Sequence, residues 1–154
     1  MTAVTKKRFG FTGAAAAWTV FIFSQSLLSG AVSSAESGTV LRFLQSLFGS
    51  TGFGEWVTEH LIRKTAHFTE YAILGVLLIL AVHSFGRLRR SPTVPLFLGL
   101  LVPVLDESLQ LFTEGRAGQL SDVLLDYTGA LTGMALCLLV LILLRRRKRA
   151  KNNG

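Results

Sequence analysis

Four apolar stretches, each about as long as a membrane-spanning helix, most constrain how this chain can fold. They run roughly over residues 9–28, 65–85, 92–112 and 123–144. About 20 helical residues are needed to cross a hydrocarbon core about 30 Å thick. Only 16% of the 154 residues are charged, against about 25% in soluble domains. The pattern predicts an all-α integral membrane protein of one domain, residues 1–154, built as a four-helix bundle.

The basic residues predict the orientation of these four spans. Most of the 16 basic residues lie at the N-terminus, between the second and third stretches, or at the C-terminus. Four spans place these three regions on one side, which the positive-inside rule assigns to the cytoplasm. We therefore expect both termini inside the cell and anionic lipid headgroups as partners of the net charge of +7, with no nucleic acid bound. The residues are Lys6, Lys7, Arg8, Arg87, Arg89, Arg90, Arg145, Arg146, Arg147, Lys148, Arg149 and Lys151.

The first apolar stretch has a second interpretation as a secretory signal peptide. A basic start precedes it, and Ser33-Ser34-Ala35 before Glu36 resembles a cleavage site. Because the stretch is long for a signal peptide, we expect it to be retained as the first span. Cleavage, which would leave three spans, stays the alternative.

The segment between the first and second spans contains a second type of helix. After small and polar residues, Val40, Leu41, Leu44, Leu47 and Phe48 recur at helical spacing. An apolar stripe on an otherwise polar segment is typical of a helix that lies in the membrane interface. We predict a short amphipathic helix in the outer interface between spans 1 and 2.

The acidic residues lie on the side opposite to the basic clusters. Glu70, Asp106, Glu107 and Asp126 even lie inside the apolar stretches. A charge in the membrane core costs at least about 2.5–3.5 kcal/mol on insertion scales, so such residues normally face a cavity or a charged partner. These carboxylates therefore predict a polar site within the helices.

Helical spacing brings further polar residues to the same depth. Arg63, His67 and Glu70 are spaced to share one helix face, and Asp122 and Asp126 share another. We predict a polar cup that is open to the exterior and roofed by the loop between the third and fourth spans. The residues expected to line it are Arg63, Lys64, His67, Glu70, Asp106, Glu107, Gln110, Arg116, Asp122 and Asp126.

An enzyme would divide these residues between two tasks. Arg63, Lys64, Gln110 and Arg116 would bind the substrate, since arginine suits bidentate contacts with phosphate or carboxylate. Proton or cation handling would fall to the catalytic candidates. Clustered carboxylates could share a proton or bind a divalent cation, and whether any metal is used stays open. The catalytic candidates are His67, Glu70, Asp106, Glu107, Asp122 and Asp126.

Two other interpretations need no chemistry. The acids and bases could simply pair, which makes insertion tolerable and fixes helix packing. The cup could instead bind or transport a ligand, although four spans without an inverted repeat would require oligomers for transport.

Elsewhere, the spacing of Gly129 and Gly133 indicates close helix packing. The single cysteine, Cys137, excludes an internal disulfide framework.

Two blocks of sequence resemble the signatures of VanZ-like proteins. The first is Arg63-Lys64-Thr65-Ala66-His67-Phe68-Thr69-Glu70-Tyr71, followed by Leu74-Gly75. The second is Asp106-Glu107-Ser108-Leu109-Gln110-Leu111-Phe112, followed by Arg116, Asp122-Val123 and Gly129. Asp126 stands where the family usually has Asn.

The resemblance covers residues 9–144 and implies a role in the cell envelope. The founding VanZ-like protein is associated with resistance to teicoplanin-type glycopeptide antibiotics, which act on outer-face cell-wall precursors. The resemblance thus implies a protein that acts on or binds a cell-envelope lipid or cell-wall precursor. The alternative is a non-catalytic membrane protein that binds or modulates a partner and whose intramembrane charges are mainly structural.

Overall fold

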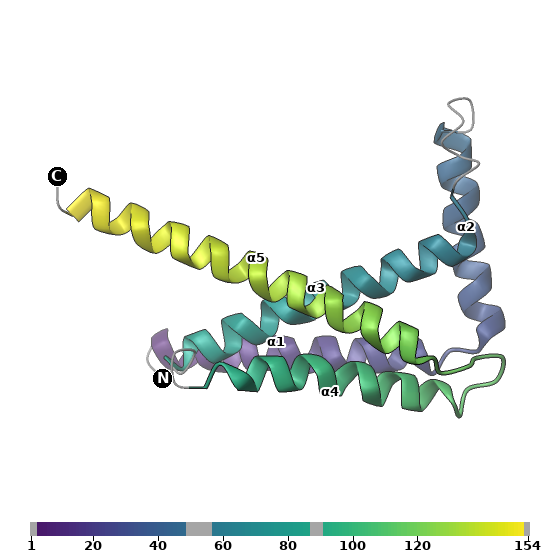
Figure 1. Ribbon diagram of the computed structural model, residues 1–154, viewed down its shortest axis with the longest axis horizontal. Helices are drawn as coiled ribbons and strands as arrows, with labels where there is room; N and C mark the ends of the chain where they lie inside the picture. Colours follow the sequence, from purple (N-terminus) through teal and green to yellow (C-terminus); the bar gives the residue numbers. More distant parts are fainter. Residues whose placement is uncertain (1–2, 49–56, 87–90, 153–154) are drawn as a thin grey trace.

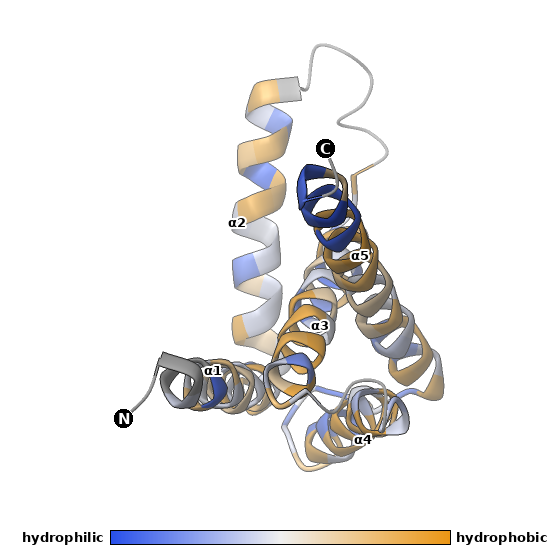
Figure 2. Ribbon diagram, turned by 90° about the vertical axis from the view of Figure 1, so that its left-hand side faces the viewer, coloured by the Kyte–Doolittle hydropathy of each residue, from blue (hydrophilic) through white to orange (hydrophobic). Residues whose placement is uncertain are grey.

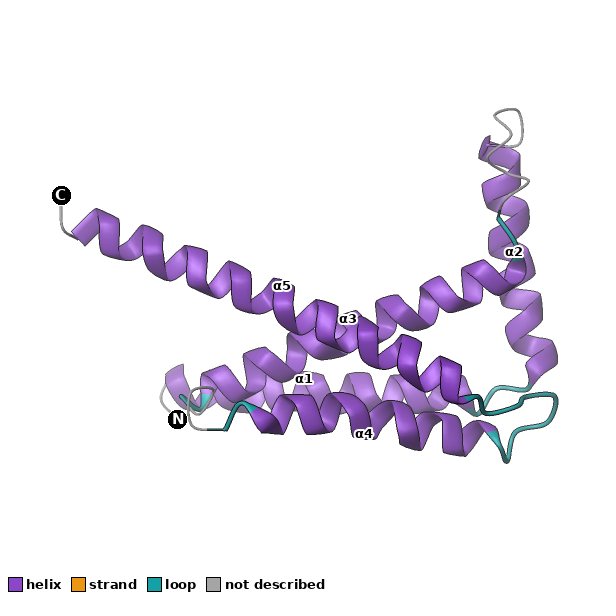
Figure 3. Cartoon of the chain, in the orientation of Figure 1, coloured by secondary structure: helices purple, strands orange, loops and turns teal. Residues whose placement is uncertain are grey.

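The computed structural model describes residues 3–48, 57–86 and 91–152 of the chain. Within these residues it contains helices and loops but no strand (Figure 3), which confirms the predicted all-α fold class. The helices are α1 (Ala3–Ser26), α2 (Gly30–Phe48), α3 (Glu59–Ser84), α4 (Thr93–Gln110) and α5 (Leu120–Asn152).

Three of these helices, α3, α4 and α5, are each long and apolar enough to cross a membrane. A fourth crossing is reached only if α1 and α2 are taken as one span, whose halves, residues 8–26 and 30–47, are bent by 103°. The chain is therefore a multi-pass membrane protein with three or four candidate spans. Helices α3, α4 and α5 correspond to the predicted stretches 65–85, 92–112 and 123–144.

Both termini lie at one end of the helices, and the α1–α2 turn and the α4–α5 loop lie at the other (Figure 1). This arrangement agrees with the predicted connectivity. Which end faces the cytoplasm stays a prediction, and the basic residues Arg87, Arg89 and Arg90 lie outside the described residues.

Helix α3 is the centre of the fold. It contacts each of the other four helices, and its most extensive contact is with α5. The two cross (Figure 1), α1 packs against α3, and α4 packs against both α3 and α5. Buried side chains from α1, α3, α4 and α5, including Ile22, Tyr71, Val102 and Met134, form the core. The outer faces carry exposed apolar side chains, and the C-terminal turns of α5 are hydrophilic (Figure 2). A regular four-helix bundle stays a prediction.

Small residues let α3 and α5 approach closely where they cross. A Cβ atom added at Gly133 would overlap the backbone of Ala72, and one added at Gly129 would overlap that of Phe68. From the other side, Gly75 faces the backbone of Ala130 in the same way. Small residues at such positions allow membrane helices to pack backbone against backbone, as the spacing of Gly129 and Gly133 predicts.

Helix α2 is longer than the amphipathic segment predicted near its C-terminal half. It begins at Gly30, whose backbone N–H donates to the carbonyl oxygen of Glu114 at 3.0 Å. The hydroxyl oxygen of Ser29 accepts a hydrogen bond from the backbone N–H of Val32, as the side chain of an N-cap residue does. The small and polar residues after Ser29 are therefore helical. Two members of the expected apolar stripe, Val40 and Leu47, are 45% and 56% exposed, and the place of the stripe in the outer interface stays a prediction.

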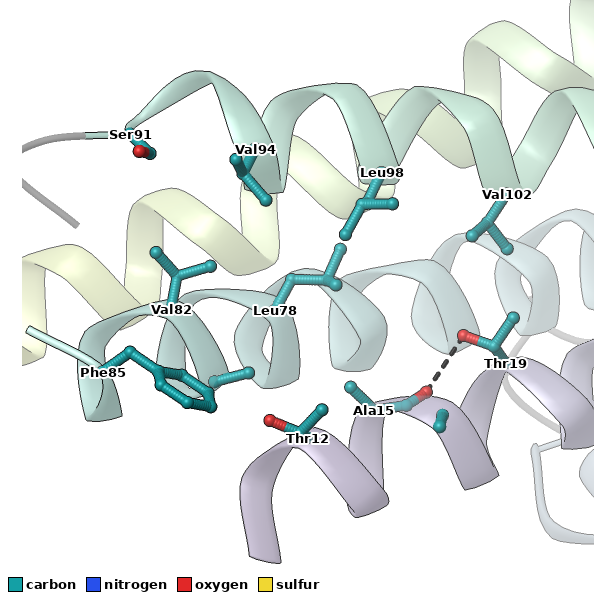
Figure 4. A pocket seen from close by; sticks show the side chains of 12 residues that line it. Thr12, Ala15, Thr19, Leu78, Val82, Phe85, Ser91, Val94, Leu98 and Val102 are labelled. Atoms are coloured by element: carbon teal, nitrogen blue, oxygen red, sulfur yellow. Dashed lines mark hydrogen bonds between the residues drawn. The ribbon is translucent and has the colours of Figure 1, made fainter. Parts of the chain in front are cut away.

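A cavity of about 580 Å³ lies between α1, α3 and α4, toward the end that holds the termini (Figure 4). Apolar side chains such as Leu78, Leu98 and Val102 line it, together with hydroxyl groups. One of these, that of Thr19, donates to the carbonyl oxygen of Ala15 at 2.9 Å. None of its described lining residues is charged, so this cavity is separate from the polar residues of the predicted cup.

Candidate functional site

Two cavities at the end opposite to the termini form the polar cup. One, of about 260 Å³, lies between α3, α5 and the α4–α5 loop. The other, of about 220 Å³, lies between α1, α2 and α3. Arg63, His67 and Arg116 line both cavities. The first also contains Lys64, Gln110, Asp122 and Asp126, and the second Glu70.

Arg116 is fixed by backbone carbonyl groups near the end of α1. Its Nε donates to the carbonyl oxygen of Leu28 at 3.0 Å, and its Nη2 donates to that of Gln25 at 3.1 Å. The preceding residue, Gly115, has a φ of 71°, a left-handed conformation that glycine adopts without steric cost. Burial, with the neighbouring positive charge of Arg63, lowers the pKa of Arg116, but a guanidinium stays protonated in proteins.

Arg63 also has an uncharged partner. Its Nη2 donates to the hydroxyl oxygen of Ser34 on α2 at 2.9 Å, while its Nε is buried without a hydrogen-bond partner. Among the described residues, the only ion pair within 4.0 Å joins Lys64 Nζ and Asp122 Oδ1, at 3.3 Å. Arg63 and Arg116 thus keep their charges without a directly paired carboxylate.

Two carboxylates and an imidazole converge at the base of the cup. His67 from α3, Asp106 from α4 and Asp126 from α5 each offer one ligand atom, and these atoms lie within 4.8 Å of one another. Both aspartates are 0% exposed. Their carboxylate oxygens and His67 Nδ1 have no hydrogen-bond partner. We call these three residues the basal cluster.

Polar side chains lie beside the basal cluster without satisfying it. Ser26, Tyr71 and Gln110 are close to the carboxylate of Asp106, yet none donates to it with hydrogen-bond geometry. Gln110 Nε2 instead donates to the hydroxyl oxygen of Ser26 at 3.4 Å. The surroundings of Asp106 are therefore polar, but no cation among the described residues forms an ion pair with it.

The two glutamates of the signatures occupy different places. Glu70 lines the second cavity, and its backbone carbonyl accepts a bond from Trp18 Nε1 at 2.9 Å, which joins α1 to α3. Glu107 is buried and lines neither cavity. Its Oε2 accepts the backbone N–H of Gln119 at 2.9 Å. Glu107 therefore anchors the α4–α5 loop beside the cup.

Helix α2 contributes lining residues that were not among the predicted ones. Ser33, Glu36 and Ser37 line the second cavity, and Ser34 holds Arg63. The signal was present, because Ser33 and Ser37 are spaced to share a helix face. It was overlooked because the helix was expected to begin nearer Val40.

A family model described as VanZ/LLP1 matches residues 11–143 of the chain. The matched region includes every residue predicted to line the cup. No curated protein and no solved structure matches the chain.

Proposed function

The chain belongs to the VanZ/LLP1 family, and on that premise we propose that its polar cup binds the anionic headgroup of a cell-envelope lipid or cell-wall precursor. Binding would take place at the outer face of the cytoplasmic membrane and would contribute to resistance against teicoplanin-type glycopeptides. The observation that carries the proposal is the pair of arginines, Arg63 and Arg116. Both line the two cavities, and neither has a carboxylate partner among the residues that the structure describes.

Both guanidiniums are held in place and still have donors to offer. A guanidinium has five N–H donors in a planar fork that matches phosphate and carboxylate groups. Arg116 uses two of them on backbone carbonyl groups, and Arg63 uses one on Ser34. An anion between the two side chains would use the remaining donors and relieve the repulsion between two like charges.

The arrangement is difficult to explain by structural pairing alone. If the charged residues served only to neutralise one another, carboxylates should contact Arg63 and Arg116. The ion pair found among the described residues, Lys64–Asp122, involves neither arginine. Meanwhile the basal cluster keeps its buried carboxylates without hydrogen-bond partners. Separated, unpaired groups of opposite charge favour a bound ligand over a self-contained structural network.

Catalysis is a second candidate function because His67 lines both cavities. An imidazole can act as a general acid or base near neutral pH. A headgroup bound by Arg63 and Arg116 would lie within the same pair of cavities as His67. The chemistry would then be proton transfer during hydrolysis or transfer of the headgroup, while a binding protein would need His67 only for packing and hydrogen bonding.

Resistance in living cells tests the proposal. A glycopeptide-sensitive host would express the wild type, Arg63→Gln or Arg116→Gln, with membrane levels checked by immunoblot. The matched control is Arg42→Gln, because Arg42 donates to Thr39 on α2 at 3.1 Å and lines neither cavity. We expect the control to keep the teicoplanin resistance of the wild type and both cup variants to lose it. Equal resistance of all four proteins at equal levels would refute a functional cup.

Direct binding separates the two candidate functions and the source of the anion. The purified proteins in nonionic detergent would be titrated with inorganic phosphate and with a short-chain phosphatidylglycerol. We expect the lipid to bind more tightly than phosphate and both to bind more weakly to Arg116→Gln. His67→Gln that binds normally but confers no resistance would favour catalysis, whereas normal binding with full resistance would favour a binding protein.

A further inference from the structure

We propose that His67, Asp106 and Asp126 bind a divalent transition-metal ion at the base of the polar cup. The site would be built by three helices, with one ligand each from α3, α4 and α5. This metal site adds to the proposed anion site and can be tested without any anion.

The distances within the basal cluster fit a single ion. Its three candidate ligand atoms lie within 4.8 Å of one another. Zinc binds imidazole nitrogen and carboxylate oxygen at about 2.0–2.2 Å, so two atoms on one ion lie at most about 4.4 Å apart. Small rotations of the side chains would therefore bring all three atoms to coordination distance without moving the helices.

The buried carboxylates supply an independent reason to expect a cation. Asp106 and Asp126 are 0% exposed, and neither has a hydrogen-bond partner. A buried charge is costly unless it is paired or coordinates a metal. The carboxylates of Asp106, Glu107, Asp122 and Glu70 act electrostatically on Asp126. The guanidiniums of Arg63 and Arg116 act on His67, so the acids around the cluster outnumber these two bases. A bound cation would compensate the charge of Asp106 and Asp126, which pair with no cation in the described part of the chain.

The mixed ligand set selects the kind of metal. Imidazole suits zinc, copper, iron and nickel, while carboxylate also suits manganese, and all-oxygen sites suit magnesium and calcium. Cys137 offers no thiolate here, since it lies three turns farther along α5. One nitrogen with two carboxylates therefore favours Zn²⁺ or Mn²⁺ over Mg²⁺ or Ca²⁺.

Two of the three residues of the basal cluster border a cavity, while Asp106 lines neither cavity. His67 and Asp126 line the cavity of about 260 Å³ that also contains Arg63 and Arg116. Three protein ligands leave at least one coordination position of a zinc ion open, as in catalytic sites. An anion bound by the arginines could occupy that position, which would place one phosphate oxygen on the metal.

Metal analysis of the full-length purified protein tests the proposal. After purification in nonionic detergent, the wild type would be stripped with chelator, equilibrated with Zn²⁺ or Mn²⁺, and desalted. We expect about one ion per chain by mass spectrometry and a rise in the melting temperature upon loading. Asp106→Asn and Asp126→Asn should each weaken binding at least tenfold, and His67→Gln likewise. The double variant Asp106→Asn/Asp126→Asn should retain no ion.

Controls distinguish the site from nonspecific binding and from misfolding. Glu59 and Glu114 lie at the same end of the molecule but outside the basal cluster. The variants Glu59→Gln and Glu114→Gln should therefore both keep the metal. Helical circular dichroism and gel filtration would establish that the variants fold. Loading with Co²⁺ gives visible d–d absorption bands whose position and intensity depend on the ligands of the ion, and the cluster variants should lose these bands. A wild type that neither retains nor responds to Zn²⁺ or Mn²⁺, or a double variant that binds as the wild type does, would overturn the proposal, whatever the outcome with phosphate or lipid.

Discussion

The guanidinium of Arg116 donates through Nε to the backbone carbonyl oxygen of Leu28 at 3.0 Å, across 88 residues of sequence. The contact joins the α4–α5 loop to the chain just after α1. Carbonyl groups at a helix end lack intrahelical donors and need other partners. Arg116 therefore both fixes the roof of the polar cup and presents a positive charge to it.

Replacing Arg116 by Lys should separate the effect of the guanidinium geometry from the effect of the positive charge. An ammonium keeps the charge but lacks the planar fork that reaches Leu28 and Gln25 together. We expect a loss of about 1.5–3 kcal/mol in unfolding free energy, since bonds to charged groups contribute about that much. Phosphate binding should also weaken about tenfold. Thermal unfolding in detergent and phosphate titration would measure the two effects.

Arg42→Lys is the matched control for that substitution. Arg42 is exposed and donates to Thr39 within α2, so its replacement should change neither quantity beyond experimental error. If Arg116→Lys matched the wild type in both assays, the fork geometry would be irrelevant and only the charge would matter.

The ion pair between Lys64 and Asp122 should contribute little to stability. Its side chains are 35% and 32% exposed, and pairs near water typically contribute about 0.2–1 kcal/mol. A double-mutant cycle with Lys64→Gln and Asp122→Asn, measured by unfolding in detergent, should give a coupling energy in that range. A coupling energy above about 2 kcal/mol would instead support the interpretation that intramembrane charges are structural.

The sequence predicted the helices better than the contacts between them. Apolar stretches of about 20 residues are a local property, so the predicted stretches fall largely within α3, α4 and α5, although α3 begins earlier, at Glu59, and α5 ends later, at Asn152. Helical spacing likewise brought His67 and Asp126 to one cup. The near balance of charges suggested pairing, but which groups meet depends on how helices pack. The hydrogen bond from Arg63 to Ser34, for example, depends on how α3 packs against α2.

The start of α2 and the position of Glu107 depend on contacts with a segment that is distant in the sequence. Gly30 begins the helix where its N–H reaches the carbonyl of Glu114, which lies in a distant loop. Glu107 is next to Asp106 in the sequence, yet its carboxylate meets the backbone of Gln119 rather than the cavities. Both outcomes depend on the conformation of the α4–α5 loop, for which the sequence provided no periodic pattern.

Two substitutions of Glu107 distinguish a loop anchor from a catalytic acid. Glu107→Ala removes the acceptor of the Gln119 N–H, and an unsatisfied buried donor costs about 1–3 kcal/mol. Glu107→Gln keeps a carbonyl oxygen, so it should lose less than half as much stability and keep full teicoplanin resistance. Melting temperatures and resistance would be measured side by side. A stable Glu107→Gln protein without resistance would return Glu107 to the catalytic candidates.

Replacing Gly133 by Ala should separate α3 from α5 at their crossing. The added methyl group would overlap the backbone of Ala72, and backbone cannot move aside as a flexible side chain can. Overpacking of this kind typically costs about 1–3 kcal/mol, and we expect a lower melting temperature in detergent together with weaker metal retention at the basal cluster. Gly13→Ala on α1 is the control, since a Cβ there meets nothing within 4 Å and alanine favours helices by about 0.5–1 kcal/mol. Because the two changes are chemically identical, equal melting temperatures for both variants would show that the crossing does not hold α3 and α5 as closely as described.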